Sequence, residues 1–136
     1  MPPLTRWFVK AALVYFIGAL LLGILLQAEP VRALPALQVA WPTYVHILVV
    51  GWLTQLIFGV AFWLFPRYSA ERPRGSERLG WATFALINVG LVLRVVAEPL
   101  AGLGYRVGVM LVASAVAQFL AGMAFVANTW PRLRER

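Results

Sequence analysis

The stretch WPTYVHILVVGWLTQLIFGVAFWLFPR, residues 41–67, decides the fold of this chain. Between Trp41 and Phe65 it holds no Asp, Glu, Lys or Arg, and it stops at Pro66 and Arg67. A run of about 20 apolar residues is long enough to cross the roughly 30 Å hydrocarbon core of a bilayer as a helix. Because a helix satisfies its own backbone hydrogen bonds in lipid, we predict a transmembrane helix over residues 41–65.

Three further apolar blocks of similar length accompany this helix, and the third block of the chain ends at Pro99. Hydrophobic residues make up 62% of the chain and charged residues 12%, about half the charged fraction of a soluble domain. The sequence therefore predicts an all-α polytopic membrane protein, a single domain over residues 1–136 built as a four-transmembrane-helix bundle. The expected helices are 7–27, 41–65, 79–98 and 104–130.

Positive charge is unevenly placed along the chain, and its placement predicts the orientation. Nine of the twelve basic residues lie near the start of the first block, between the second and third blocks, or after the fourth. Because positive loops stay inside, we expect both termini in the cytoplasm and the protein in a bacterial inner membrane. This placement also explains the net charge of +7 without a nucleic-acid partner. The nine residues are Arg6, Lys10, Arg67, Arg72, Arg74, Arg78, Arg132, Arg134 and Arg136; Arg32 and Arg106 occupy the other loops.

The chain has no cysteine, which limits its chemistry. Disulfides, thiolate metal sites, iron–sulfur clusters and covalent c-type haem attachment all require cysteine and are excluded. The first block is longer than the apolar part of a signal peptide and no cleavage-like site follows it, so we expect no cleaved signal.

The second helix carries the only histidine of the chain, His46. At about 100° per residue, one face of an α-helix contains His46 together with Val50, Leu53, Ile57 and Leu64. A different face contains Gly51, Gln55, Gly59 and Phe62, a pattern typical of a helix-packing seam. We therefore expect the helix to pack on one side and to present an imidazole on the other.

The third and fourth helices also carry polar stripes. Arg94 and Glu98 are four residues apart and can pair; alternatively, the Arg94 fork can neutralise an anionic group such as a haem propionate. On the fourth helix, Ser114 and Gln118 are typical of interhelical hydrogen bonding. Met110 is either a packing residue or an axial thioether ligand. The stripe on the third helix consists of Thr83, Ile87, Gly90, Arg94 and Glu98. The stripe on the fourth helix consists of Met110, Ser114, Gln118, Ala121, Phe125 and Asn128.

Three of these residues are predicted to lie at a similar depth in the membrane. His46, Arg94 and Met110 each lie about four to six residues inside the outer end of the predicted helix, or roughly 6–9 Å deep. The sequence therefore predicts that a ligand, an anion clamp and a possible second ligand share one layer. His46 is then either a metal or haem ligand or a histidine that bonds to a neighbouring helix.

The stretch from His46 to Arg67, HILVVGWLTQLIFGVAFWLFPR, resembles the second transmembrane helix of haem–copper oxidase subunit I. In that family a histidine early in this helix is an axial ligand of the low-spin haem near the outer face. The resemblance covers about one helix well and the first four helices loosely. It implies a small stand-alone subunit I-like protein in which His46 binds haem b.

The chain also departs from that family, because it has no other histidine. It cannot build a binuclear centre, so we do not expect it to reduce oxygen as an enzyme. If haem binds, the sixth position is empty, or is filled by water, by Met110, or by His46 of another chain in a homo-oligomer. The implied role is electron transfer with a redox partner or binding of a diatomic gas.

Two other functions remain open at this stage. The chain can be a non-catalytic membrane subunit or assembly factor of a respiratory complex, with a structural His46. It can also be a small transporter or channel in which Asn88 and the Arg94–Glu98 pair line a path. An intramembrane hydrolase is disfavoured, because the chain lacks a Ser/His/Asp set.

Overall fold

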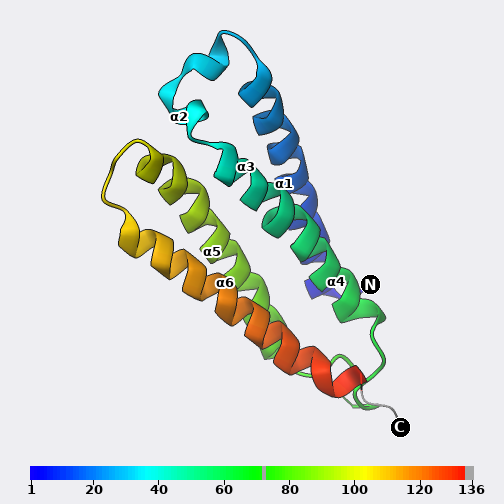
Figure 1. The fold of residues 1–136 in the computed structure, drawn as a ribbon. Helices are drawn as coiled ribbons and strands as arrows, with labels where there is room; N and C mark the ends of the chain where they lie inside the picture. The colour runs from blue at the N-terminus through cyan, green and yellow to red at the C-terminus, as the bar shows by residue number, and fades with distance from the viewer. Residues whose placement is uncertain (72, 134–136) are drawn as a thin grey trace.

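The computed structural model describes residues 1–71 and 73–133 as a bundle of helices (Figure 1). Within these residues every regular element is helical. Four stretches are long and apolar enough to cross a membrane: Pro3–Gln27, Trp41–Leu64, Glu77–Gly102 and Gly108–Leu133. The prediction of an all-α fold with four membrane-crossing helices is confirmed, and the chain is a multi-pass membrane protein.

The first stretch is α1 (Pro3–Gln27), and a short connection made of η1 (Val31–Ala33) and α2 (Pro35–Gln38) follows it. The second stretch consists of α3 (Trp41–His46), η2 (Ile47–Thr54) and α4 (Gln55–Leu64). The third is α5 (Glu77–Gly102), and the fourth consists of α6 (Gly108–Thr129) and η3 (Trp130–Leu133).

Several helix ends differ from the prediction. α1 begins at Pro3, because proline suits the first turn of a helix. α5 continues through Pro99 to Gly102, since a proline in the last turn removes only one helical hydrogen bond and Leu103 still donates to the Pro99 carbonyl at 3.0 Å. α6 begins later than residue 104, because Gly104 adopts a φ of +91° in the preceding turn.

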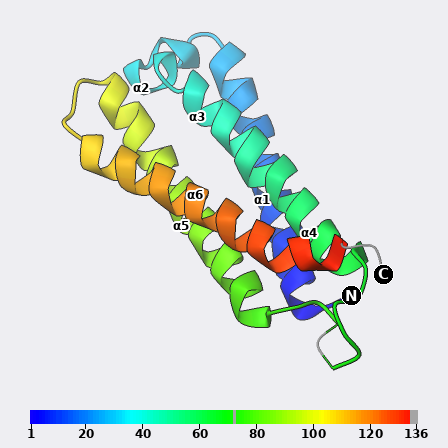
Figure 2. The ribbon, with the colours of Figure 1, turned by 60° about the horizontal axis from the view of Figure 1, so that its bottom comes forward.

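The helices form two hairpins that pack side by side (Figures 1 and 2). In the first hairpin α1 packs against η2 and α4, and in the second α5 packs along α6. The hairpins meet mainly where α5 contacts α3 and η2. The start of α1, the end of α4 and the start of α5 lie at one end of the bundle, where Leu4, Phe8 and Phe62 join the core with Ile87 and Ala121.

Glycines let the helices of this core approach closely. A Cβ added at Gly59 would lie 2.7 Å from the Phe8 Cβ, and one at Gly80 would lie 2.5 Å from Leu4. The packing seam predicted on the second helix is confirmed, because Gly51, Gln55, Gly59 and Phe62 are all buried. In contrast, large apolar side chains such as Val14 and Val109 are exposed, as expected for helix faces that meet lipid.

The second stretch is not a uniform α-helix, and this corrects one prediction. Residues Ile47–Thr54 are wound as a π-helix, in which each N–H reaches the fifth preceding carbonyl. This wider winding turns the chain by less per residue than an α-helix does. His46 and Gln55 therefore do not point to opposite sides, and both bond to α5, through Glu98 and Asn88.

Arg132 has a structural place that its position in the tail did not indicate. Only 3% of the residue is exposed, and its guanidinium donates to the carbonyls of Phe62, Phe65 and Pro66 at 3.1, 2.7 and 2.9 Å. These carbonyls lie at the end of α4, where no helical donor remains for them. Arg132 thus caps α4 and joins it to η3. The basic residues Arg72, Arg134 and Arg136, which the charge prediction also used, lie outside the described residues.

Candidate functional site

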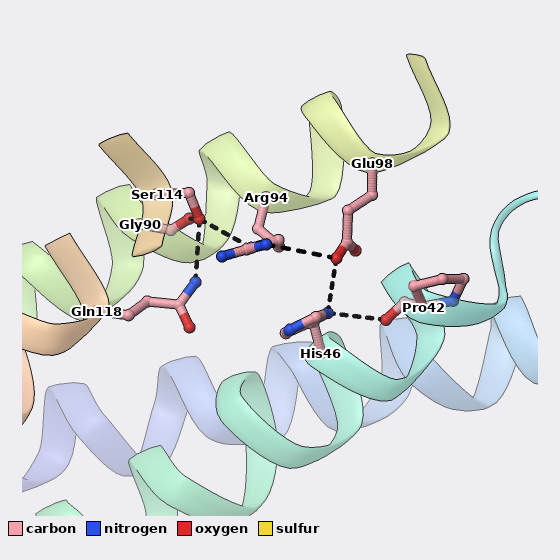
Figure 3. Close-up of polar contacts among 7 residues, drawn as sticks. All are labelled: Pro42, His46, Gly90, Arg94, Glu98, Ser114 and Gln118. Carbon is pink, nitrogen blue, oxygen red and sulfur yellow. Dashed lines mark hydrogen bonds and ion pairs between the residues drawn. The ribbon is translucent and has the colours of Figure 1, made fainter. Parts of the chain in front are cut away.

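His46 is the centre of a polar cluster between the two hairpins (Figure 3). It is the last residue of α3, and its Nδ1 lies 2.9 Å from Oε1 of Glu98 on α5. The same nitrogen lies 3.0 Å from the carbonyl oxygen of Pro42, one turn earlier in its own helix. The imidazole is therefore held by one contact within its helix and one contact across the bundle.

These two contacts determine the tautomer of His46. A carbonyl oxygen can only accept a hydrogen bond, so Nδ1 must carry the hydrogen that Pro42 and Glu98 share. In the neutral imidazole the lone pair then resides on Nε2. About a third of the side chain, 32%, is exposed, whereas only 11% of the Glu98 side chain is exposed. The ring thus has a fixed orientation, with a buried carboxylate on one nitrogen and, among the described residues, no partner on the other.

Glu98 is only partly satisfied by its neighbours. Nη1 of Arg94 lies 3.9 Å from Oε1, longer than a hydrogen bond. The second oxygen, Oε2, is buried and has no hydrogen-bond partner among the described residues. The i,i+4 pair that the sequence allowed is therefore present but weak, and His46 is the closer partner of this carboxylate.

Arg94 turns toward α6. Its Nε donates to the hydroxyl of Ser114 at 3.1 Å, and that hydroxyl donates to the Gly90 carbonyl at 2.6 Å. Gln118 also donates to the Ser114 hydroxyl, at 3.1 Å. Only 19% of the Arg94 side chain is exposed, so the guanidinium does not extend along the helix to the membrane surface. Ser114 is fully buried and joins α5 to α6, as predicted for interhelical hydrogen bonding.

The three candidate site residues are placed differently. His46 and Arg94 belong to one cluster, because both approach Glu98 (Figure 3). Met110 is half-buried in the first turn of α6, four residues before Ser114 and on the same helix face. Among the described residues it takes no part in the polar cluster, and it stays a candidate ligand from sequence alone.

A second polar cluster lies deeper between the hairpins. The Oδ1 of Asn88 accepts from the Tyr15 hydroxyl at 3.1 Å and from Gln55 at 3.3 Å. Its Nδ2 donates to Gln55 at 3.1 Å and to the Phe84 carbonyl at 2.8 Å. Gln55 is fully buried. Asn88 is thus held by three helices, and this contact set is better suited to packing than to lining a transport path.

Sequence reasoning missed the His46–Glu98 contact, although one signal for it exists. Both residues lie toward the same end of two long apolar stretches, and ionisable residues inside a membrane tend to pair with each other. Within residues 1–71 and 73–133, no group of three or more His, Cys, Asp or Glu side chains is arranged to hold a metal ion. No protein-family model, no curated protein and no solved structure matches this chain.

Proposed function

We propose that the chain is a b-type haem-binding membrane protein in which Nε2 of His46 would hold the haem iron. The observation that carries the proposal is the orientation of the imidazole, with Nδ1 held by Glu98 and Pro42 and with no partner for Nε2 in residues 1–71 and 73–133. Histidines that bind metals usually donate their other N–H to a carboxylate or carbonyl, which fixes the ring and raises its basicity. His46 has both kinds of acceptor.

The residues around His46 fit such a group. About a third of the imidazole side chain is exposed, so a ligand could approach the ring from the surface of the bundle. Arg94, one helical turn from Glu98, is the cation that would neutralise a propionate, because its guanidinium has nitrogens beyond the one bonded to Ser114. Glu98 would hold the ring in place as the ligand binds.

Haem, when bound, would supply one-electron transfer or binding of a diatomic gas. The choice between these two roles would depend on the sixth position of the haem iron, for which Met110 or, in a homo-oligomer, His46 of a second copy is the candidate. A filled sixth position favours electron transfer to a redox partner, whereas an open one favours gas binding. The resemblance of residues 46–67 to subunit I of haem–copper oxidases supports this proposal, including its relation to respiratory electron transport.

The sidedness of the protein is also part of the proposal. Both termini would lie in the cytoplasm of a bacterial cell, and His46 would lie near the outer face of the inner membrane. The excess of arginine at the end of the bundle that carries the 65–76 loop supports this orientation.

A second candidate is a non-catalytic membrane subunit or assembly factor of a respiratory complex. One observation favours it: Nδ1 of His46 and Nε of Arg94 already have partners inside the chain, as structural residues do. In that case His46 and Glu98 would serve only to join α3 to α5.

Absorption spectra of the detergent-purified chain, expressed with added haem, separate the two candidates. We expect a Soret band that His46→Ala removes while the helices stay inserted. A sharp α-band after dithionite reduction would indicate a filled sixth position, and a large carbon monoxide shift an open one. Met110→Leu should keep the Soret band, and loss of the sharp α-band in this variant would place Met110 at the sixth position. A chain without a Soret band, or an unchanged band in His46→Ala, would contradict haem ligation and favour the structural role.

A further inference from the structure

A second site lies at the opposite end of the bundle from His46, where α5 begins. Oδ1 of Asn128, on α6, accepts a hydrogen bond from the backbone N–H of Ser76 at 2.8 Å. Because a backbone N–H can only donate, this contact identifies the side-chain oxygen, and the other terminal atom of Asn128 is the NH₂ group. That nitrogen is buried and has no partner among the described residues, and only 5% of Asn128 is exposed.

Asn128, which carries the unpartnered NH₂ group, lines a hollow of ≈ 200 Å³. Tyr68 and Ser76 line this hollow from the loop before α5, and Ala127, Asn128 and Pro131 line it from the other side. Gly75 allows the close approach, because it adopts a φ of +74° and a Cβ there would lie 2.7 Å from Oδ1 of Asn128. The hollow is therefore walled by two distant segments that the Ser76–Asn128 hydrogen bond holds together.

The charges around this hollow favour an anion. α5 is 26 residues long, and its first-turn N–H groups have no helical acceptors, which leaves positive partial charge at this end. Ser76 caps one of them, accepting from the Leu79 N–H at 3.3 Å. Arg74 and Arg78 lie two residues before and after Ser76 in the chain, and Arg78 lines a neighbouring hollow together with the acid Glu77. The residues next to the hollow thus carry two positive charges against one negative charge. An acceptor oxygen in this hollow would meet the Asn128 NH₂ group and a helix N-terminus together.

We infer that this hollow binds a phosphate group, either that of an anionic lipid headgroup or free phosphate. A phosphate oxygen would accept from Asn128, and the net positive charge of Arg74, Glu77 and Arg78 near the start of α5 would attract the anion. The location suits a lipid, because the site lies at the end of four membrane-crossing helices. This site is separate from His46, so its test is independent of haem binding.

The test measures thermal unfolding of the full chain in an uncharged detergent. The probes are inorganic phosphate against chloride at equal ionic strength, and dioleoyl phosphatidylglycerol against dioleoylglycerol, which has the same acyl chains and no phosphate. Binding to the folded state raises Tm by an amount that increases with the ligand concentration relative to its Kd. A rise with the phospholipid alone supports a headgroup site. A rise with inorganic phosphate alone supports a site for soluble phosphate, and a rise with both supports recognition of the phosphate group. No rise above either control overturns the inference.

Two variants test whether the phosphate group binds in this hollow. Asn128→Asp keeps an acceptor for Ser76 but replaces the free donor by a carboxylate oxygen, so the Kd of the phosphate probe should rise at least about tenfold. Ala127→Phe should fill the hollow from its rim and have the same effect if Asn128→Asp does not fold. Ala113→Phe, at an exposed position of the same helix, is the matched control and should bind as the unaltered chain does. Unchanged binding in Ala127→Phe or in folded Asn128→Asp would overturn the inference.

Discussion

Nδ1 of His46 and Oε1 of Glu98 lie 2.9 Å apart, although 52 residues separate them along the chain. The contact joins the end of α3 to the last turns of α5 and is one of the few polar links between the two hairpins. In a low-dielectric environment such a hydrogen bond is stronger than in water, and loss of either partner leaves the other unsatisfied. The contact therefore both positions the imidazole and stabilises the bundle.

We predict that Glu98→Gln lowers the haem affinity of the chain about 10- to 100-fold while keeping the Soret band at saturating haem. The amide can still accept from Nδ1, but it makes the imidazole a weaker donor to the metal, so the midpoint potential should rise. Haem titration and a redox titration measure the two effects. Glu29→Gln, in the exposed pair with Arg32, is the control and should change neither value. Equal affinity and potential in Glu98→Gln would show that Glu98 does not support the ligand.

Ser114→Ala should destabilise the bundle by about 1–3 kcal/mol, because Ser114 is fully buried and its hydroxyl serves Gly90, Arg94 and Gln118. Reversible unfolding in mixed micelles measures the change. Since Arg94 loses its hydrogen-bond acceptor on α6, haem retention should weaken as well. An unchanged free energy of unfolding would mean that waters or lipid replace the hydroxyl.

The polar cluster around Asn88 predicts that Gln55 contributes more to the stability of the bundle than Tyr15 does. Gln55→Leu should lower the free energy of unfolding by about 1–2 kcal/mol, since Asn88 loses both contacts with Gln55. Tyr15→Phe removes a single hydrogen bond to Asn88 and should have about half that effect. The same unfolding assay ranks the variants. A larger effect for Tyr15→Phe would contradict the central role of Gln55.

Gly59→Ala should destabilise the protein by about 1–3 kcal/mol, because the new Cβ would lie 2.7 Å from the Phe8 Cβ in the core. Gly122→Ala is the matched control, since a Cβ at Gly122 would have no neighbour within 4 Å. That change should be neutral or slightly stabilising, as alanine favours a helix more than glycine does. Similar effects at the two positions would argue against the close packing of α1 and α4.

The absence of cysteine makes the orientation easy to test. Leu34→Cys and Tyr105→Cys, at exposed positions in the two loops away from the termini, should react with a membrane-impermeant maleimide in intact cells. Tyr68→Cys, exposed in the loop between α4 and α5, should react only after lysis. The reverse pattern would place both termini outside the cell.

Apolar length and charge were sufficient to predict the four helices, and small residues were sufficient to predict the seam containing Gly51 and Gly59. The contacts of the candidate site were harder to predict from the sequence, for two physical reasons. Helical periodicity assigned Glu98 to Arg94, whereas its closer partner, His46, lies on another helix at a distance that no sequence interval indicates. Periodicity also assumes uniform winding, which fails at Ile47–Thr54.

Arg132 illustrates a third difficulty. In the sequence it is one of several arginines in a basic tail, and its charge alone indicates the cytoplasmic side. In the structure it belongs to η3, and its guanidinium lies over the rings of Phe62 and Phe65, 5.9 and 6.0 Å from the ring centres. Nothing local distinguishes such a residue from its exposed neighbours, because the carbonyls that it bonds belong to a segment some 66 residues earlier.

The wide turns of η2 make this membrane stretch sensitive to insertions and deletions in a way that hydropathy does not reveal. Removing one residue from Ile47–Thr54 would leave a span of nearly the same length and polarity. If the segment kept its π-helical winding, the deletion would rotate His46 relative to Gln55 by the turn of one residue, which is less than the roughly 100° of an α-helix, so that only one of them could still face α5. Any relative that keeps the π-helical winding and both contacts must therefore keep the number of residues between them, whatever apolar side chains fill the interval.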